Sequence, residues 1–479
     1  MGNIIFRKSE YLYGLKEMIL GLFPAYLGST FTYSRIGDNL EEFVEFISVK
    51  TEVHSSGKYT QEQLEEHTDY VERFVQDLCA DVGAKEPAFK SKELVGRGSH
   101  YEKTKVVSVD ECDFLIPLAL SDDENVQVEN LGEDCFRYGG GDIGYGVVTV
   151  RLASLKQGFA DDMVKKYTKG RHILSCKLVK KIQHAIKHSL ESRLGSKFKG
   201  YADLQYGPKD TYPVGVCSMN EYCHGPSIWL RLGTPLTTTD IDLCFCIERF
   251  GRSPRTVMVP LGGEVEKKFY LKLCKCFVED CHWMESIVDP PNDNKHVLTR
   301  WHKQVFICMK FISHILCTVG GKTSSFTLKT LVLKHQVRCK SNNVGECFEA
   351  VVRDMCGRKD NQSGCEPDTF DITLQNDVVY DVDYPGREIY HPIKKSNIIP
   401  AFIWFLQHVK YTKDTDWWCH LLDEGFPESV PESGLLWSFI QTYRKCIDQY
   451  AHDEKVMKFE WPHYANHTTK LSIRHQRHS

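Results

Sequence analysis

The chain has 479 residues, of which 42% are hydrophobic and 26% charged, and its formal net charge is −4. This length exceeds what one small core supports, so we expect a globular protein of two or three domains. No uncharged apolar run reaches about 18 residues, which argues against a membrane span. Without a secretory signal, the 19 cysteines are expected to be reduced in a cytoplasmic protein.

The first half of the chain predicts both helices and strands. Apolar residues recur at helical spacing over residues 64–82, with acids on the opposite face. A basic helical stretch is expected over residues 161–194. Strands are predicted at residues 109–116, 147–152, 226–232 and 241–247.

The second half is mainly helical beyond a Pro- and Gly-containing segment at residues 254–263, which we expect to join two lobes. Strands towards the N-terminus and helices towards the C-terminus predict an α+β fold. Helices are predicted at residues 301–316, 325–335, 344–355, 398–409 and 434–450. The expected divisions are an extension (1–40), a catalytic lobe (41–265), a helical lobe (266–460) and a basic tail (461–479).

Three carboxylates form the most informative pattern. Glu111 and Asp113 begin a strand that continues into Phe114-Leu115-Ile116, and alternate residues of a strand share a face. Asp242 lies in a second hydrophobic strand, where Asp240 on the same face is the alternative. Acids that enter a buried strand need a compensating partner, and three of them can hold two divalent metal ions.

A Gly98-Ser99 pair precedes the first two acids. A turn of this composition offers backbone N–H groups and a hydroxyl to a triphosphate. Together with the acids, it is typical of a nucleotidyltransferase.

These motifs, in this order, resemble cyclic GMP-AMP synthase and the animal cyclic GMP-AMP synthase-like receptors, within the wider Mab-twenty-one group. The resemblance runs from about residue 60 to about residue 410. Its further segments are His224–Leu230 before the third acid, and the pair Cys308–Ile312 and Ser324–Thr330.

The resemblance implies a two-lobed nucleotidyltransferase fold with a mixed β-sheet lobe, a long spine helix and a C-terminal helical lobe. It implies that Glu111, Asp113 and Asp242 are catalytic and hold Mg²⁺ or Mn²⁺. Both ions suit oxygen ligands, so the choice between them stays open.

The resemblance also implies nucleotide contacts for ATP- and GTP-type substrates. Gly98 and Ser99 would cradle the triphosphate, and Lys310 would contact phosphate or base edges. Ser325 would hydrogen-bond the nucleotide, and Phe326 would stack on a nucleobase.

The chain departs from the family pattern at the lobe junction. Where the family has Trp-Arg-x-Ser-Phe-Ser, the best match is Trp283-Met284-Glu285-Ser286, although Arg300-Trp301 offers a second register. The clustered zinc ligands of the vertebrate DNA sensor are not matched before Lys310. No structural zinc is therefore expected.

Residues 165–199 hold eleven Lys or Arg and one acid, Glu191. Such a local excess in a chain of negative net charge indicates a surface that contacts phosphates. The corresponding spine helix of the family binds double-stranded nucleic acid, and double-stranded RNA is favoured over DNA. The expected contacts are Lys165, Lys166, Lys169, Arg171, Lys177, Lys180, Lys181 and Lys187.

The other cysteine groups do not favour a metal site. Cys274, Cys276 and Cys281-His282 lack paired CxxC spacing. A second set recurs every eight or nine residues and is interpreted as buried free thiols. This set is Cys339, Cys347, Cys356 and Cys365.

The sequence therefore predicts an innate immune enzyme that joins two nucleoside triphosphates into a cyclic dinucleotide after sensing double-stranded nucleic acid. Three alternatives stay open: an inactive binding or scaffold protein of the Mab-twenty-one group, a synthase of linear oligonucleotides, and a synthase with a different trigger.

Overall fold

The structure, a computed structural model, divides into two compact units. The sheet unit comprises Glu52–Val297 and Tyr380–Arg387, and the helical unit comprises Met1–Thr51, Leu298–Val379 and Glu388–Ser479. The structure describes residues 38–121, 126–130, 144–151, 163–166, 171–202, 211–223, 225–261, 281–316, 323–355, 370–371, 378–390, 402, 405–406, 409–410, 418, 457–460 and 470–473.

A large mixed sheet dominates the sheet unit and confirms the expected α+β class. Its order is β5-β6-β4-β12-β11-β10-β9-β8-β7, with β2 joining β10 and β1, and β3 joining β4. The strands are β1 (Val95–Arg97), β2 (Glu111–Pro117), β3 (Val126–Asn130), β4 (Tyr145–Arg151), β5 (Val164–Lys166), β6 (Arg171–Leu174), β7 (Phe198–Ala202), β8 (Cys217–Asn220), β9 (Ile228–Gly233), β10 (Thr238–Arg249), β11 (Thr256–Pro260) and β12 (Trp283–Ile287).

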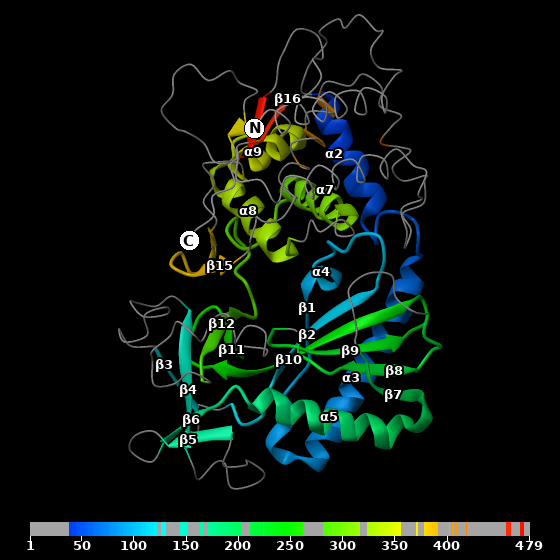
Figure 1. Cartoon of the computed structure of the whole chain (residues 1–479), viewed down its shortest axis with the longest axis vertical. Coiled ribbons are helices and arrows are strands. Elements are labelled where there is room, and N and C mark those ends of the chain that lie inside the picture. The colour runs from blue at the N-terminus through cyan, green and yellow to red at the C-terminus, as the bar shows by residue number, and fades with distance from the viewer. Residues whose placement is uncertain are drawn as a thin grey trace, which may run out of the picture. The chain divides into compact units, whose positions relative to one another are not determined.

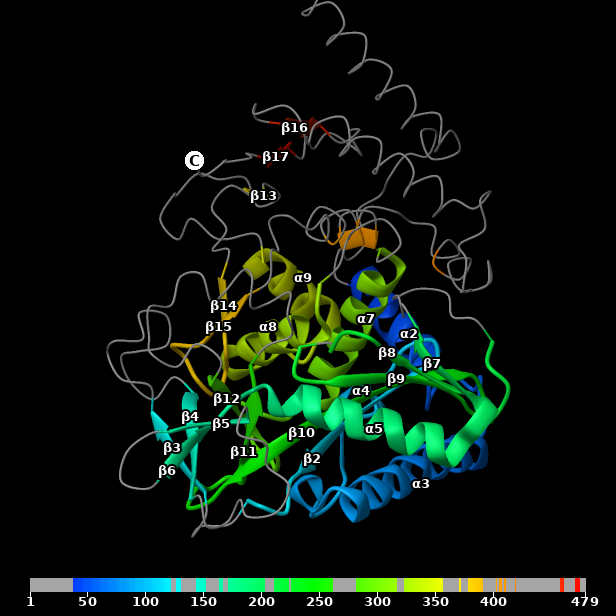
Figure 2. The same ribbon diagram turned by 60° about the horizontal axis from the view of Figure 1, so that its bottom comes forward.

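Two long helices, α3 (Gln61–Lys85) and α5 (Leu178–Leu194), cover one face of this sheet (Figures 1 and 2). Thr60 caps α3 in a reciprocal capping box with Gln63. Beneath the helices lie the alternate residues Cys112, Phe114 and Ile116 of β2, with the odd-numbered apolar residues of β10. This alternation leaves Glu111, Asp113 and Asp242 on the opposite face.

The expected basic helical stretch is only partly helical. Helix α5 begins at Leu178, whereas Val164–Lys166 and Arg171–Leu174 are strands. Strand β6 pairs with both β4 and β5. Sheet hydrogen bonding therefore overrides local propensity there.

The segment expected to join the lobes is instead a strand of the sheet. Strand β11 pairs with β10 and β12, and all of its residues are buried. Pro254 lies just before this strand and Pro260 is its last residue, and a strand tolerates proline at its ends better than in its interior. The division between units falls at Val297, later than the expected residue 265.

The helical unit contains α2 (Asp38–Thr51), α7 (Arg300–Leu316), α8 (Ser325–Arg338) and α9 (Val344–Met355). The last three were predicted from helical periodicity. Phe43 of α2 packs on Phe348 of α9, with ring centroids 6.4 Å apart. Residues 38–51, which the sequence divided between an extension and the catalytic lobe, thus belong to this unit.

Short strands occur late in the chain. Part of the expected tail forms β17 (Lys470–Ile473), which pairs with β16 (Met457–Glu460) and β13 (Phe370–Asp371). Strands β14 (Val378–Tyr380) and β15 (Glu388–Tyr390) form a separate pair. The predicted helix at 434–450 lies outside the described residues, as does most of 398–409.

Among the described residues, no helix combines the length and apolar character needed to cross a bilayer.

Buried histidines predict acid sensitivity of the sheet unit. His67 and His100 are buried, with ring centroids 6.3 Å apart, and each accepts or donates one hydrogen bond with a threonine, Thr234 and Thr68 respectively. Burial lowers the pKa of both to about 4, and for His100 the neighbouring histidines and Lys105 lower it further. For His67, Asp110 opposes this shift.

Because the unfolded chain takes up protons near pH 6.5 and the folded chain only near pH 4, stability should fall as the pH falls through this window. The loss per histidine is of the order of 3 kcal/mol at pH 4. Urea unfolding between pH 7.5 and 4 measures it. The His67→Gln, His100→Gln variant should lose less stability over the same window, and an equal loss would contradict the assignment.

Candidate metal and nucleotide site

Three carboxylates meet on the sheet face opposite α3 and α5. Parallel pairing of β2 with β10 sets Asp242 beside Asp113, and one ligand oxygen from each of Glu111, Asp113 and Asp242 lies within 4.8 Å of the others. Like charges this close repel unless a cation neutralises them. Carboxylate oxygens are the ligands that Mg²⁺ and Mn²⁺ prefer, so these residues fit a divalent ion.

The alternative ligand, Asp240, is engaged elsewhere. Its carboxylate forms a buried fork with Arg231, with Nε–Oδ1 2.7 Å and Nη2–Oδ2 3.1 Å. A buried ion pair with this geometry is costly to break from one side. Asp242 is thus the acid of β10 that faces the other two.

Lys105 is a buried cation beside the acids, to which the sequence gave no role. Its Nζ lies 2.7 Å from Glu111 Oε2 and 3.1 Å from Asp110 Oδ1. Burial alone would lower the pKa of Lys105, but these two carboxylates outweigh burial and raise it. Lys105 therefore stays charged and holds the Glu111 carboxylate in place. The sequence signals for Lys105 were its place six residues before Glu111 and its position in the segment that follows the Gly-Ser pair.

Gly98 packs directly against Asp113. Its φ is +72°, a backbone conformation that residues other than glycine rarely adopt. A Cβ atom at this position would lie 1.9 Å from Asp113 Oδ2. The next residues form the short helix α4 (Gly98–Tyr101), where the Ser99 carbonyl accepts from Thr104 N at 2.8 Å. The Gly-Ser loop and the acids are thus one local constellation.

The other expected nucleotide contacts lie in the helical unit. Lys310 is half-buried on α7, and Ser325 and Phe326 begin α8. Ser324 caps that helix by accepting from Thr327 N at 3.1 Å, and Phe326 is 54% exposed. Ser325 is therefore not the capping residue of α8, and Phe326 is not a core residue.

The expected nucleic-acid contacts spread over three elements of the sheet unit. Lys165 and Lys166 are exposed on β5, and Lys177 and Lys180 are exposed at the start of α5. Lys181 is half-buried on α5. Lys169 lies outside the described residues.

Two members of this basic set are held by neighbours. Arg171 donates from Nε to Thr149 Oγ1 at 2.9 Å and from Nη2 to the Thr149 carbonyl at 2.8 Å. Lys187 pairs with Glu191 and lies over the Tyr201 ring. Of the expected contacts at α5, the exposed ones are therefore Lys177 and Lys180 at its N-terminal end. Arg193 near the C-terminus is exposed too, but it pairs with Asp77.

The departure at Met284 lies on the acid-bearing side of the sheet. Met284 packs beside Leu115 and Cys244, which follow the acids along β2 and β10. Trp283 is buried and donates to the Leu174 carbonyl at 3.1 Å. Strand β12 therefore carries an apolar side chain at the better of the two sequence matches to the arginine of the family pattern.

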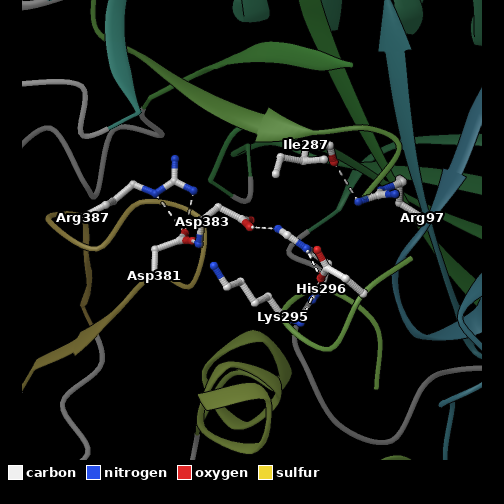
Figure 3. Close-up of polar contacts among 8 residues, drawn as sticks. Arg97, Ile287, Lys295, His296, Asp381, Asp383 and Arg387 are labelled. Carbon is white, nitrogen blue, oxygen red and sulfur yellow. Dashed lines mark hydrogen bonds and ion pairs between the residues drawn. The ribbon is translucent and has the colours of Figure 1, made fainter. Parts of the chain in front are cut away.

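Two separate sets of polar contacts hold the end of β1 and a late segment of the chain (Figure 3). Arg97 donates to the carbonyls of Val288 and Ile287 at 2.7 and 3.0 Å. His296 contacts Asp293 at 2.6 Å and Asp383 at 2.8 Å. Because Asp383 comes from residues 380–387, its contact with His296 ties that late segment to the rest of the sheet unit.

Comparison with protein-family models and with curated proteins finds no match for this chain.

Gly98→Ala should disrupt the acid site. Both Gly98 and Gly57 have positive φ, but a Cβ at Gly57 meets nothing within 4 Å. Each Ala variant should lose roughly 1–2 kcal/mol of stability from backbone strain. Only Gly98→Ala should also weaken Mn²⁺ binding, by about tenfold or more, because it displaces Asp113. Titration calorimetry with Mn²⁺ measures this, and equal Mn²⁺ affinity in the two variants would refute the packing argument.

Proposed function

We propose that this chain is a metal-dependent nucleotidyltransferase that makes a cyclic dinucleotide, a second messenger of innate immune signalling. The observation that carries the proposal is the meeting of Glu111, Asp113 and Asp242 within 4.8 Å, on the sheet face away from the helix layer. The packing of Gly98 on Asp113 supports it, because a phosphate-binding turn must lie beside the metal ligands.

In the proposed reaction, a ribose hydroxyl oxygen of one nucleotide bonds to the α-phosphorus of another, and pyrophosphate leaves. A second such step closes the ring, and each hydroxyl proton passes to solvent. Divalent ions held by the three acids would lower the pKa of the hydroxyl and neutralise charge on the phosphoryl group.

The chain's own residues would position the substrates. Lys105 keeps the Glu111 carboxylate oriented, and the Gly98-Ser99 loop would hold the triphosphate. As the resemblance implies, Lys310 and Ser325 would bind the nucleotide, and Phe326 offers an exposed aromatic face for stacking. Phosphoryl transfer depends mainly on positioning and charge neutralisation, which are the roles assigned here.

The proposed trigger is double-stranded nucleic acid, with RNA favoured. Lys177, Lys180 and Lys181 lie at the N-terminal end of α5, where the helix dipole already favours anions. Positive side chains at the positive end of the helix dipole destabilise the helix, and bound backbone phosphates would neutralise these charges. Recognition would be by backbone and shape, since the exposed side chains are lysines.

A second candidate is a binding protein that keeps the fold without catalysis. Met284 favours it, because an apolar side chain cannot replace the cation of the family pattern. Retention of all three acids favours the enzyme.

Removing the acids should abolish synthesis. Glu111→Gln with Asp113→Asn should lower product formation from labelled ATP and GTP with Mn²⁺ by at least about 100-fold. The exposed acid Asp69, on α3, provides the matched control Asp69→Asn. Phosphatase-resistant product identifies a cyclic dinucleotide. No product from the unchanged chain under any nucleotide, metal or nucleic-acid condition would favour the binding protein.

Charge reversal on α5 should weaken the trigger. Lys180→Glu with Lys181→Glu should reduce affinity for double-stranded RNA about tenfold or more and flatten its salt dependence. Lys90→Glu changes an exposed lysine outside α5 and serves as control. Filter binding over a salt series measures both effects. Equal affinity and turnover in the two variants would direct attention to a trigger other than nucleic acid.

A further inference from the structure

A second group of metal-ligand side chains lies entirely within the helical unit. His302 of α7, His335 of α8, Cys339 just after α8 and Cys347 of α9 each offer a ligand atom, and these atoms all lie within 4.8 Å of one another. Two thiols and two imidazoles are the set that tetrahedral zinc takes in structural sites.

The separations approach those of a tetrahedron. Cys339 Sγ and Cys347 Sγ are 3.5 Å apart, and Cys347 Sγ lies 3.9 Å from His302 Nε2. A zinc–sulfur bond of about 2.3 Å places two thiolates about 3.8 Å apart in a tetrahedron. Both cysteines are free thiols in the structure. Small side-chain adjustments would therefore suffice to bring all four atoms to one ion.

The two histidines present nitrogens suited to a ligand. His302 Nδ1 lies 2.7 Å from Thr299 Oγ1, a contact that orients the ring and leaves Nε2 towards the cysteines. His335 Nε2 is buried and has no hydrogen-bond partner within the described part of the chain. Leaving such a nitrogen unsatisfied costs about 1–3 kcal/mol, which a metal bond would remove.

Thr299 is itself fixed by α8. Its backbone N–H donates to Gln336 Oε1 at 2.8 Å, and Gln336 directly follows His335 on α8. The orientation of the ligand on α7 thus depends on the helix that carries the second histidine. Such support around the ligands is typical of metal sites.

We propose that His302, His335, Cys339 and Cys347 bind one structural Zn²⁺ that fastens α7, α8 and α9 together. Binding forms two zinc–nitrogen and two zinc–sulfur bonds and releases the two thiol protons to solvent. Sequence reasoning expected no zinc and interpreted these cysteines as buried thiols. It missed the site because the ligands come from three helices with no paired spacing.

Metal content of the full chain, purified without a metal-affinity step, tests the proposal. We expect about one zinc per chain by mass spectrometry of the elements, and loss of most of it in Cys339→Ser, Cys347→Ser. Cys223, a half-buried cysteine of the sheet unit that forms no disulfide, gives the matched control Cys223→Ser, which should keep its zinc. Glu111→Gln with Asp113→Asn should also keep it, which separates this site from the carboxylates.

Cobalt substitution of the unchanged chain avoids dependence on a variant that fails to fold. Co²⁺ in place of zinc should give thiolate-to-metal absorption and the visible bands of a tetrahedral ion, which oxygen ligands alone would not produce. Three results would overturn the proposal: no uptake of Zn²⁺ or Co²⁺ by the reduced chain, zinc retained in the double cysteine variant, or a Cys339–Cys347 disulfide in the native protein.

Discussion

The parallel pairing of β2 with β10 is the constraint on which the candidate acid site depends. It sets Asp242 beside Asp113. If either strand slipped by one residue in the pairing register, its acids would point into the face covered by the helices. The register is fixed because the apolar alternates of both strands are buried beneath α3 and α5. The same packing that stabilises the core thus determines where three negative charges meet. Asp240, two residues before Asp242 and paired in register with Glu111, is neutralised by Arg231 instead.

Two opposite ways of neutralising buried charge occur within a few residues. Arg231 satisfies Asp240 with two hydrogen bonds in a closed pair, whereas Lys105 is shared between Asp110 and Glu111. The closed pair engages both carboxylate oxygens of Asp240. Asp113, which pairs in register with Asp242, instead lies beside Gly98, and the missing side chain there permits close approach of another group. The difference separates an acid that stabilises the fold from acids suited to chemistry.

Much of the architecture could be predicted from residue patterns, because it depends on local periodicity. The apolar alternation around Glu111 and Asp242 identified both strands, and the helical spacing at residues 344–355 predicted α9 with its observed bounds. The failures have non-local causes. Strand β6 forms by pairing with β4, and β5 forms by pairing with β6. The prolines at the two ends of β11 suggested a linker, and only its pairing with β12 shows that the segment is a strand. For the same reason the Arg231–Asp240 pair and the gathering of His302, His335, Cys339 and Cys347 were invisible in sequence.

The distance along the chain between β2 and β10 also bears on how the molecule is made. During synthesis at about 5–20 residues per second, β2 waits on the order of ten seconds for its parallel partner. One of its edges can pair at once with β1, which is close in sequence, but the other exposes the backbone beside Phe114, Leu115 and Ile116 until β10 is made. Pairing over such a separation is slow because loop-closure entropy opposes it. A nascent chain that ends before Thr238 therefore holds two acids and an open, apolar strand edge, and lacks the third acid altogether.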